Sequence, residues 1–303
     1  MSVIVSDLTK KYGEQFALDH LSFEAHKGEV LGFLGPNGAG KSTTMKILTC
    51  FIPPTSGTAT VGGIDIAKDP LAVRSKIGYL PESNPLYYDM YVVEYLEFVA
   101  GVHQLGDKSA KRIADMIEMT GLGREQHKTI RQLSKGYKQR VGIAQAMLHD
   151  PEVLILDEPT SGLDPNQLIE IRSLIKQLGK DKTVIFSSHI LQEVQAIADR
   201  VVIINKGKLV ANDTSASLQD KISNQTIVKA AFKQSLDNAT MGQLKGLKSF
   251  DKSADGKWRL VSDGTGDLRE LVFEFAKQKN LTLLHLEKES YSLEDVFKQL
   301  TAR

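Results

Sequence analysis

The chain has 303 residues, which is room for about two domains and a full hydrophobic core. Its 38 lysines and arginines nearly balance its 37 aspartates and glutamates, so it lacks the net field that holds nucleic acid or an anionic bilayer. The single cysteine, Cys50, excludes an internal disulfide and agrees with a reducing compartment. No apolar stretch approaches the roughly 18 residues of a membrane span, and the first residues lack the pattern of a signal peptide. We therefore expect a soluble, cytoplasmic chain.

The first fifty residues predict two strands, a glycine loop and a helix. Val3–Leu8 and Leu18–Glu24 are typical of an antiparallel edge around a turn at Gly13. The apolar run Val30–Leu34 leads into the glycines, and a helix is expected over Ser42–Phe51 with Cys50 as apolar filler. Pro53-Pro54 should end this helix, because a proline ring removes a donor and clashes with a continuing turn.

The remaining pattern is helical in the middle of the chain and mixed beyond it. Helical spacing dominates from Asp89 to about Leu148. Two buried parallel strands, a crossover helix and a last strand are then expected at Val153–Leu156, Thr183–Phe186, Gln167–Leu178 and Val201–Asn205. After residue 214 the pattern predicts a small α+β domain, with strands Thr226–Phe232, Trp258–Val261 and Leu281–Leu286 and helices Asp267–Gln278 and Ser292–Leu300.

A phosphate-binding loop is predicted between the strand Val30–Leu34 and the following helix. The segment Gly35-Pro36-Asn37-Gly38-Ala39-Gly40-Lys41-Ser42 fits the pattern G-x-x-x-x-G-K-[ST], and Thr43 follows it. Glycines let consecutive N–H groups turn toward a phosphate, and the helix start adds its positive end. Lys41 would reach the β- and γ-phosphates of ATP, and Ser42 would ligate Mg²⁺. The alternative is a merely glycine-rich start of a helix.

An acidic pair follows the second buried strand. Asp157 and Glu158 come directly after Val153–Leu156, where a parallel strand can hold carboxylates beside the phosphates. Asp157 is expected in the Mg²⁺ shell, and Glu158 is expected to act as the general base on the attacking water. A strand that ends in acids usually means only a solvated turn, but the glycine loop makes the catalytic interpretation the stronger one.

A third element, Leu133-Ser134-Lys135-Gly136-Tyr137, opens a predicted helix shortly before the acidic pair. Together with the glycine loop it resembles the ATP-binding subunits of ABC transporters, a P-loop NTPase family with an α/β core, an antiparallel β edge and a helical subdomain. In that family ATP is sandwiched between the glycine loop of one copy and this element of another. The resemblance implies that Ser134 and Gly136 receive the γ-phosphate in a homodimer or a pair with a second ABC subunit.

Three further positions match the family, and three depart from it. Tyr12 would stack on adenine, Asp164 lies in the loop by which the two copies sense each other, and His189 would contact the γ-phosphate. Lone tyrosines and histidines are otherwise often structural. Glu82 stands where the family usually has a glutamine that touches Mg²⁺ and links the site to the membrane partner. Lys135 and Tyr137 also depart from the usual glycine and glutamine, which should alter affinity rather than role.

The resemblance divides the chain into an ABC ATPase domain at 1–214, with its helical subdomain at about 84–148, and an accessory domain at 215–303. The segment Gly78–Glu82 resembles the ATP-binding subunits that serve bacterial exporters of the two-component type. The segment Ser292–Phe297 resembles the C-terminal accessory domains of the same subunits. Asn84–Tyr91 and Leu163–Leu168 are similar to ATP-binding subunits associated with gliding motility in the Bacteroidetes group.

The leading hypothesis is an ATPase that powers a separate integral membrane permease from the cytoplasmic face of the inner membrane, with no nucleic-acid partner. One alternative is a soluble ABC-type ATPase acting on nucleic acid or ribosomes. Such proteins usually carry a long coiled-coil insertion or two cassettes in one chain, and this sequence has neither. Another alternative is a regulatory module in which residues 215–303 sense a ligand.

Overall fold

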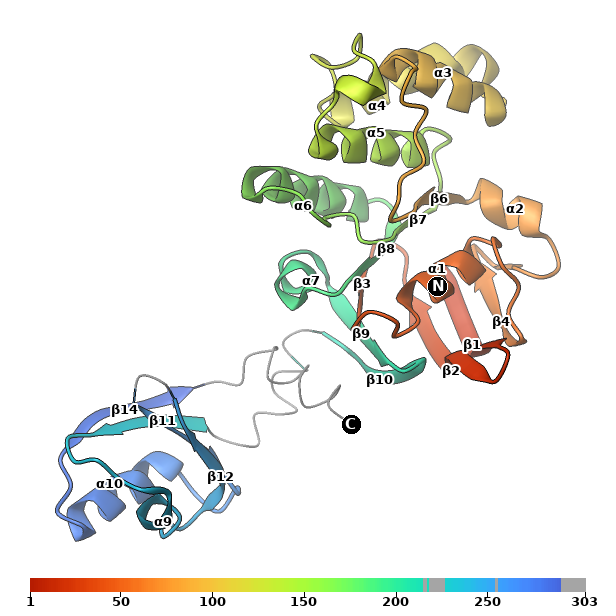
Figure 1. Cartoon of the computed structure of the whole chain (residues 1–303). Coiled ribbons are helices and arrows are strands. Elements are labelled where there is room, and N and C mark those ends of the chain that lie inside the picture. Colours follow the sequence, from red (N-terminus) through yellow and green to blue (C-terminus); the bar gives the residue numbers. More distant parts are fainter. Residues whose placement is uncertain (215–216, 218–226, 254–255, 290–303) are drawn as a thin grey trace. The chain divides into compact units, whose positions relative to one another are not determined.

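The chain forms two compact units, Met1–Thr214 and Ser215–Arg303, each considered by itself (Figure 1). The computed structural model describes residues 1–214, 217, 227–253 and 256–289. Within this described part, no helix is long and apolar enough to cross a membrane.

A six-stranded sheet in the order β10-β9-β3-β8-β7-β6 forms the centre of the first unit. The strands are β3 (Val30–Leu34), β6 (Ile77–Leu80), β7 (Val153–Leu156), β8 (Thr183–Ser188), β9 (Arg200–Asn205) and β10 (Lys208–Asp213). All neighbouring pairs are parallel except β9 and β10. The carboxyl ends of the five parallel strands therefore meet at one edge, which is where ligands bind in open α/β sheets.

The first unit also contains an antiparallel sheet in the order β2-β1-β4-β5. Its strands are β1 (Val3–Tyr12), β2 (Gln15–Ala25), β4 (Ser56–Val61) and β5 (Ile64–Asp65). Leu31 and Phe33 of β3 share one core cluster with residues of this sheet and of α1 (Lys41–Leu48). On the opposite face of β3, a Cβ at Gly32 would lie 2.5 Å from Val194 of α7 (Leu191–Ile197). The central sheet is thus covered on both sides, with α6 (Pro165–Gly179) beside α7 (Figure 1).

The expected α/β fold is confirmed, with differences at the ends of elements. Helix α1 ends at Leu48, before the prolines, because Cys50 takes a left-handed backbone with φ 55°. Cys50 therefore lies just beyond the helix, where partial burial raises the pKa of its thiol. Strand β10 follows the strand that was expected to be last; it pairs across the turn at Lys206-Gly207.

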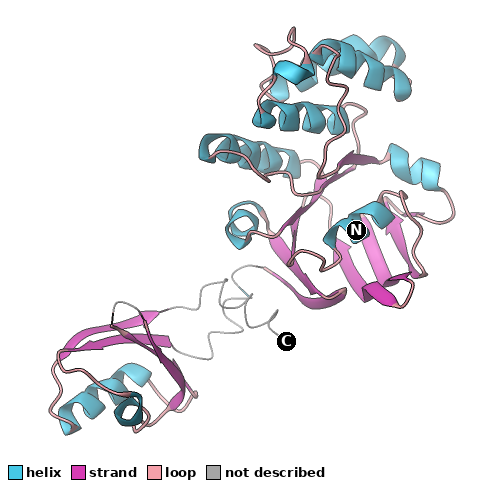
Figure 2. Cartoon of the chain, viewed as in Figure 1, coloured by secondary structure: helices cyan, strands magenta, loops and turns pink. Residues whose placement is uncertain are grey.

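The helical region predicted from the middle of the chain comprises α3 (Val92–Val102), α4 (Ser109–Met119) and α5 (Lys135–Met147). Figure 2 shows these helices grouped together, apart from the strands of both sheets. The shorter elements are α2 (Pro70–Ser75) and the 3₁₀ turns η1 (Gly106–Lys108) and η2 (Ile130–Gln132).

In the described residues of the second unit, a four-stranded antiparallel sheet in the order β12-β13-β11-β14 is accompanied by the helices α9 and α10. Its elements are β11 (Ile227–Phe232), α9 (Asn238–Met241), β12 (Leu247–Lys252), β13 (Trp258–Ser262), α10 (Leu268–Gln278) and β14 (Leu283–Glu289). Trp258, Val272 and Phe275 lie in its core. The sequence did not predict β12 or α9, and the predicted helix Ser292–Leu300 lies outside the described residues.

Candidate nucleotide site

The loops after four strands surround one cavity of about 340 Å³. Its lining includes most of the residues expected from the sequence: Asn37, Gly38, Gly40, Lys41, Ser42, Thr43, Glu82, Glu158 and His189, together with Ala17. These residues follow β3, β6, β7 and β8, apart from Ala17 on β2. They are far apart in sequence and converge because the carboxyl ends of parallel strands share one edge.

The glycine loop has the backbone geometry of an anion cradle. Gly38 and Gly40 have φ of 79° and 109°, which side-chain-bearing residues rarely adopt. A Cβ at Gly40 would lie 2.6 Å from the carbonyl oxygen of Ala17, so the loop could approach β2 only with glycine here. No side chain caps the start of α1 and its first turn holds no acid, which leaves the positive helix end to an anion.

Lys41 is a buried cation aimed along this loop. It is 6% exposed, and its Nζ donates to the carbonyl oxygen of Gly35 at 2.8 Å. The same Nζ lies 3.5 Å from Oε1 of Glu158. A buried ammonium needs partners of this kind, and a phosphate in the cavity would supply a further one.

The buried Glu158 pairs with the exposed His189 at the cavity. Oε2 of Glu158 lies 2.9 Å from Nδ1 of His189, so its two carboxylate oxygens face different partners. Glu158 also has φ of 51°, a strained backbone for a glutamate. Such strain at a buried carboxylate is typical of a functional position.

Asp157 lies behind the cavity and reveals a residue that the sequence analysis missed. It is buried, and its Oδ1 accepts from Ser187 Oγ at 2.6 Å. The same hydroxyl accepts from the backbone N–H of Glu158 at 2.9 Å. Ser187 thus ties both acids to the end of β8. The polar residues that end β8, immediately before His189, are the sequence signal that could have drawn attention to it.

Oxygen ligands suited to a hard cation are grouped near the phosphate loop. Ser42 and Glu82 line the cavity, and Asp157 lies behind it. Burial, with the nearby Asp157 and Glu82 carboxylates, raises the pKa of Tyr79 to about 12. In the described residues, no cluster of three or more His, Cys, Asp or Glu side chains could hold a metal alone. This set fits Mg²⁺ bound jointly by a few protein oxygens and by phosphates.

The other predicted residues do not line this cavity. Gly35, Pro36 and Ala39 belong to the loop itself, and Tyr12 is exposed at the end of β1, with Lys10 Nζ 5.3 Å from its ring centre. The structure leaves the expected stacking of Tyr12 untested.

Ser134 and Asp164 are found at the starts of two helices. Ser134 caps α5 through the N–H of Tyr137, and Asp164 caps α6 through the N–H groups of Asn166 and Gln167. Gly136, at the start of α5, is packed so closely against Gln167 that a Cβ would lie 2.5 Å from its side chain. Within one chain, none of the three lines the cavity that holds Lys41.

Known proteins share both the sequence pattern and the fold. The family model described as ABC transporter matches residues 18–161. The chain is 37% identical to the bacitracin transport ATP-binding protein BcrA of Bacillus licheniformis, over 99% of this chain and 98% of that protein. It is 34% identical to the linearmycin resistance ATP-binding protein LnrL of Bacillus subtilis (strain 168), over 98% and 97%.

Solved structures agree. An ATP-binding subunit of an ABC transporter superimposes with a TM-score of 0.67 at 29% identity, covering 74% of this chain and 94% of that one. The ATP-binding cassette MJ0796, described as a dimer in a post-hydrolysis state bound to ADP and Pi, gives 0.63 at 27%, covering 70% and 98%. With a phosphate cradle, a buried lysine and a Glu–His pair at one sheet edge, the chain belongs to the ABC transporter ATP-binding proteins and is an ATPase.

Proposed function

We propose that this ATPase is the energy-supplying subunit of an exporter, working with a separate membrane permease at the cytoplasmic face of the inner membrane. The observation that carries the proposal is the cavity in which Lys41 faces Glu158 and His189. Relatives that match nearly the whole chain are named for bacitracin transport and linearmycin resistance, which supports export as the task. A more specific version of this proposal links the exporter to gliding motility. The resemblance of the stretches Asn84–Tyr91 and Leu163–Leu168 to subunits of that kind supports it.

The roles in hydrolysis follow from where the charges lie. The glycine loop and the start of α1 hold the phosphates, and Lys41 neutralises the charge that develops on them. Glu158 orients and deprotonates the attacking water, and His189 keeps the Glu158 carboxylate turned toward it. Mg²⁺, when bound through Ser42, Asp157 and Glu82, supplies further electrostatic stabilisation of the phosphate oxygens.

A second copy of the chain, or a second ABC subunit, is expected to complete the site. Ser134 is exposed at the start of α5, and Asp164 is exposed enough to meet another molecule. Neither lines the cavity of its own chain. We propose that closure brings Ser134 and Gly136 of one copy onto the γ-phosphate held by Lys41 of the other, because a helix start with a hydroxyl is a suitable phosphate receptor.

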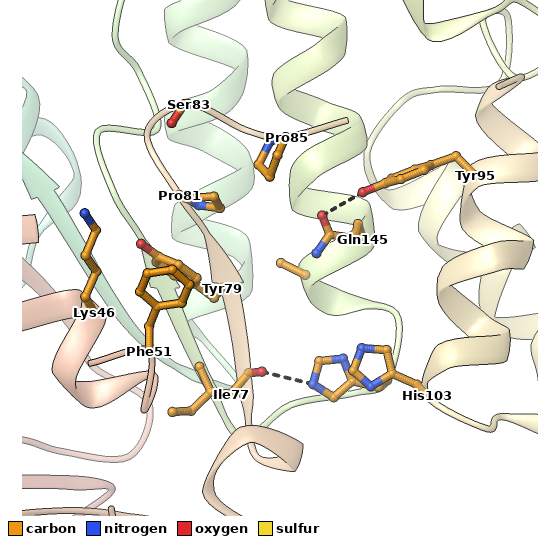
Figure 3. A pocket seen from close by; sticks show the side chains of 12 residues that line it. Lys46, Phe51, Ile77, Tyr79, Pro81, Ser83, Pro85, Tyr95, His103 and Gln145 are labelled. Carbon is orange, nitrogen blue, oxygen red and sulfur yellow. Dashed lines mark hydrogen bonds between the residues drawn. The ribbon is translucent and has the colours of Figure 1, made fainter. Parts of the chain in front are cut away.

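The permease is proposed to dock at a cavity of about 590 Å³ between the core and the helical region. Figure 3 shows Phe51 and Tyr79 on one side of this cavity, and Tyr95 and His103 on the other. Phe51 is 73% exposed, so a partner that covers it gains apolar burial. The proline-containing stretch after Tyr79, which carries Glu82, connects this surface with the nucleotide cavity.

Glu158→Gln tests the hydrolytic part of the proposal. The amide keeps the shape of the side chain but cannot accept the proton, so turnover should fall about 10²-fold or more while ATP binding remains and a closed dimer accumulates. Glu152→Gln, at an exposed glutamate paired with Lys76, is the matched control. Turnover and the oligomeric state in MgATP are measured. Unchanged hydrolysis in Glu158→Gln would remove Glu158 from the mechanism.

Co-purification from detergent-solubilised membranes tests the partner. A membrane protein should accompany the wild-type chain, and Phe51→Asp should release it. Phe273→Asp makes the same change at a phenylalanine that is 57% exposed in the other unit, and it should keep the partner. Recovery of nucleic acid or ribosomes in place of a membrane protein would favour the alternative ATPase class.

A further inference from the structure

A buried carboxylate lies behind the catalytic pair without taking part in the cavity. Glu193, in the first turn of α7, is 2% exposed. Its Oε2 accepts hydrogen bonds from Thr160 Oγ1 and from Ser188 Oγ, the latter at 2.8 Å. A buried carboxylate with hydroxyl partners carries a substantial desolvation cost, so its hydrogen bonds must form with good geometry.

One hydroxyl lies in the loop that carries Glu158, and the other ends the strand that leads to His189. Thr160 lies two residues after Glu158, and Ser188 lies directly before His189. Ser188 Oγ also accepts from the backbone N–H of Ile190 at 3.0 Å, which holds both neighbours of His189. Glu193 therefore connects the loop after β7 with the end of β8 and does not itself line the cavity.

This connection bears on the strained backbone of Glu158. A glutamate with φ of 51° keeps that conformation only when surrounding contacts hold it. Ser187 holds the N–H of Glu158, and the N–H of Ser161 donates to the carbonyl oxygen of Glu158 at 3.1 Å. Thr160 lies between Glu158 and Ser161 in the same turn, so its bond to Glu193 anchors the turn from outside.

We propose that Glu193 is a positioning residue for ATP hydrolysis, which sets the distance between Glu158 and His189 by holding Thr160 and Ser188 on one carboxylate oxygen. The inference rests on the proposed roles of Glu158 and His189. Misplacing a reacting group by a fraction of an ångström lowers turnover more than it lowers substrate binding.

Thr160→Val is the sharpest test, because it removes one hydroxyl and keeps the volume of the side chain. Turnover should fall about 10-fold or more, with the KM for ATP changed less than about twofold. A loss confined to kcat is expected because the Glu158–His189 pair is no longer held at 2.9 Å, whereas the phosphate loop that binds ATP is unchanged. Thr160→Ser restores the hydroxyl and should restore turnover.

Thr120→Val is the matched control. Thr120 is also buried, and its Oγ1 donates to the carbonyl oxygen of Met116 at the end of α4, remote from the cavity. Thr120→Val should lose stability without a change in kcat. Ser188→Ala removes the other bond to Glu193 and should reproduce the turnover loss, which keeps the proposal testable if Thr160→Val folds poorly.

Combination with Glu158→Gln separates this inference from the proposed function. If Glu193 acts through Glu158, Thr160→Val should lower the residual turnover of Glu158→Gln by less than about twofold. Unchanged turnover in Glu158→Gln refutes both the role of Glu158 as general base and the positioning role of Glu193. A normal loss in Glu158→Gln, with Thr160→Val and Ser188→Ala no different from Thr120→Val, refutes the role of Glu193 alone.

Discussion

Gly40→Ala is the substitution whose effect the structure specifies most closely. Alanine would have to adopt φ of 109°, and its Cβ would lie 2.6 Å from Ala17 O and 2.7 Å from Leu18 Cδ2. The backbone conformation costs about 1–2 kcal/mol, and the overlap with a strand carbonyl adds about 1–3 kcal/mol because β2 cannot move freely. The expected loss in the free energy of unfolding is therefore about 3 kcal/mol.

Gly63→Ala is the control for backbone strain alone. Gly63 has φ of 78°, and nothing lies within 4 Å of its Cβ position, so its loss should be about 1 kcal/mol. Denaturant unfolding should be followed by far-UV circular dichroism, because the single tryptophan, Trp258, reports on the second unit.

Nucleotide affinity is the second measurement on the variants Gly40→Ala and Gly63→Ala. A displaced loop no longer aligns its N–H groups, so Gly40→Ala should weaken binding of a fluorescent ATP analogue about tenfold or more, whereas Gly63→Ala should not. Equal unfolding free energies for the two variants, with unaltered nucleotide affinity in Gly40→Ala, would refute the close approach of the loop to β2.

Three further predictions concern the site and its surroundings. Ser187→Ala leaves the Oδ1 of Asp157 and the N–H of Glu158 without their shared partner, so turnover should fall about tenfold; unchanged turnover would contradict the anchoring role. Burial, with help from a neighbouring histidine, lowers the pKa of His149 to about 4, so the unfolded chain binds more protons between about pH 6.5 and pH 4. The contribution of neutral His149 to the free energy of unfolding is complete above pH 6.5 and is lost as the pH falls toward 4. After discounting for partial exposure, His149→Phe should remove about 1–2 kcal/mol of this pH dependence, as measured by melts at a series of pH values. Identical pH dependence in the two proteins would contradict the shifted pKa of His149. Tyr12→Ala should weaken ATP binding by about 1–3 kcal/mol while Tyr12→Phe keeps it, as measured by titration, and equal affinities would exclude base stacking.

The core strands and the phosphate loop were predictable because local pattern decides them. Val30–Leu34 and Val153–Leu156 are confirmed with the predicted bounds, since each is a short apolar run followed by a loop residue type that ends it. The end of α1 was not predictable from Pro53-Pro54, because the left-handed turn at Cys50 stops the helix first. Strand β10 was missed because its exposed, mixed-polarity residues gain their hydrogen bonds only from β9.

The candidate site was predictable in its types of residue but not in its supports. The sequence placed Lys41, Glu158 and His189 after three predicted strands, and all three residues line the cavity. Ser187 and Glu193 escaped notice, because a serine at a strand end and a glutamate in a helix have no distinctive spacing. Their importance depends on hydrogen bonds between residues about thirty positions apart in the chain.

By itself, the sequence determined the family chemistry: a glycine loop with its lysine, an acidic pair after an apolar run, and a histidine after the next strand. These are local arrangements, and the short-range preferences of glycine, apolar runs and helix starts suffice to produce them. Only the tertiary structure decided how the left-handed backbone of Glu158 is held. Ser187 accepts its N–H, and Glu193 accepts hydrogen bonds from the hydroxyls of Thr160 and Ser188 nearby. The physical reason is that parallel strands bring distant chain segments to one edge, and the bonds that position the acids form only across that edge.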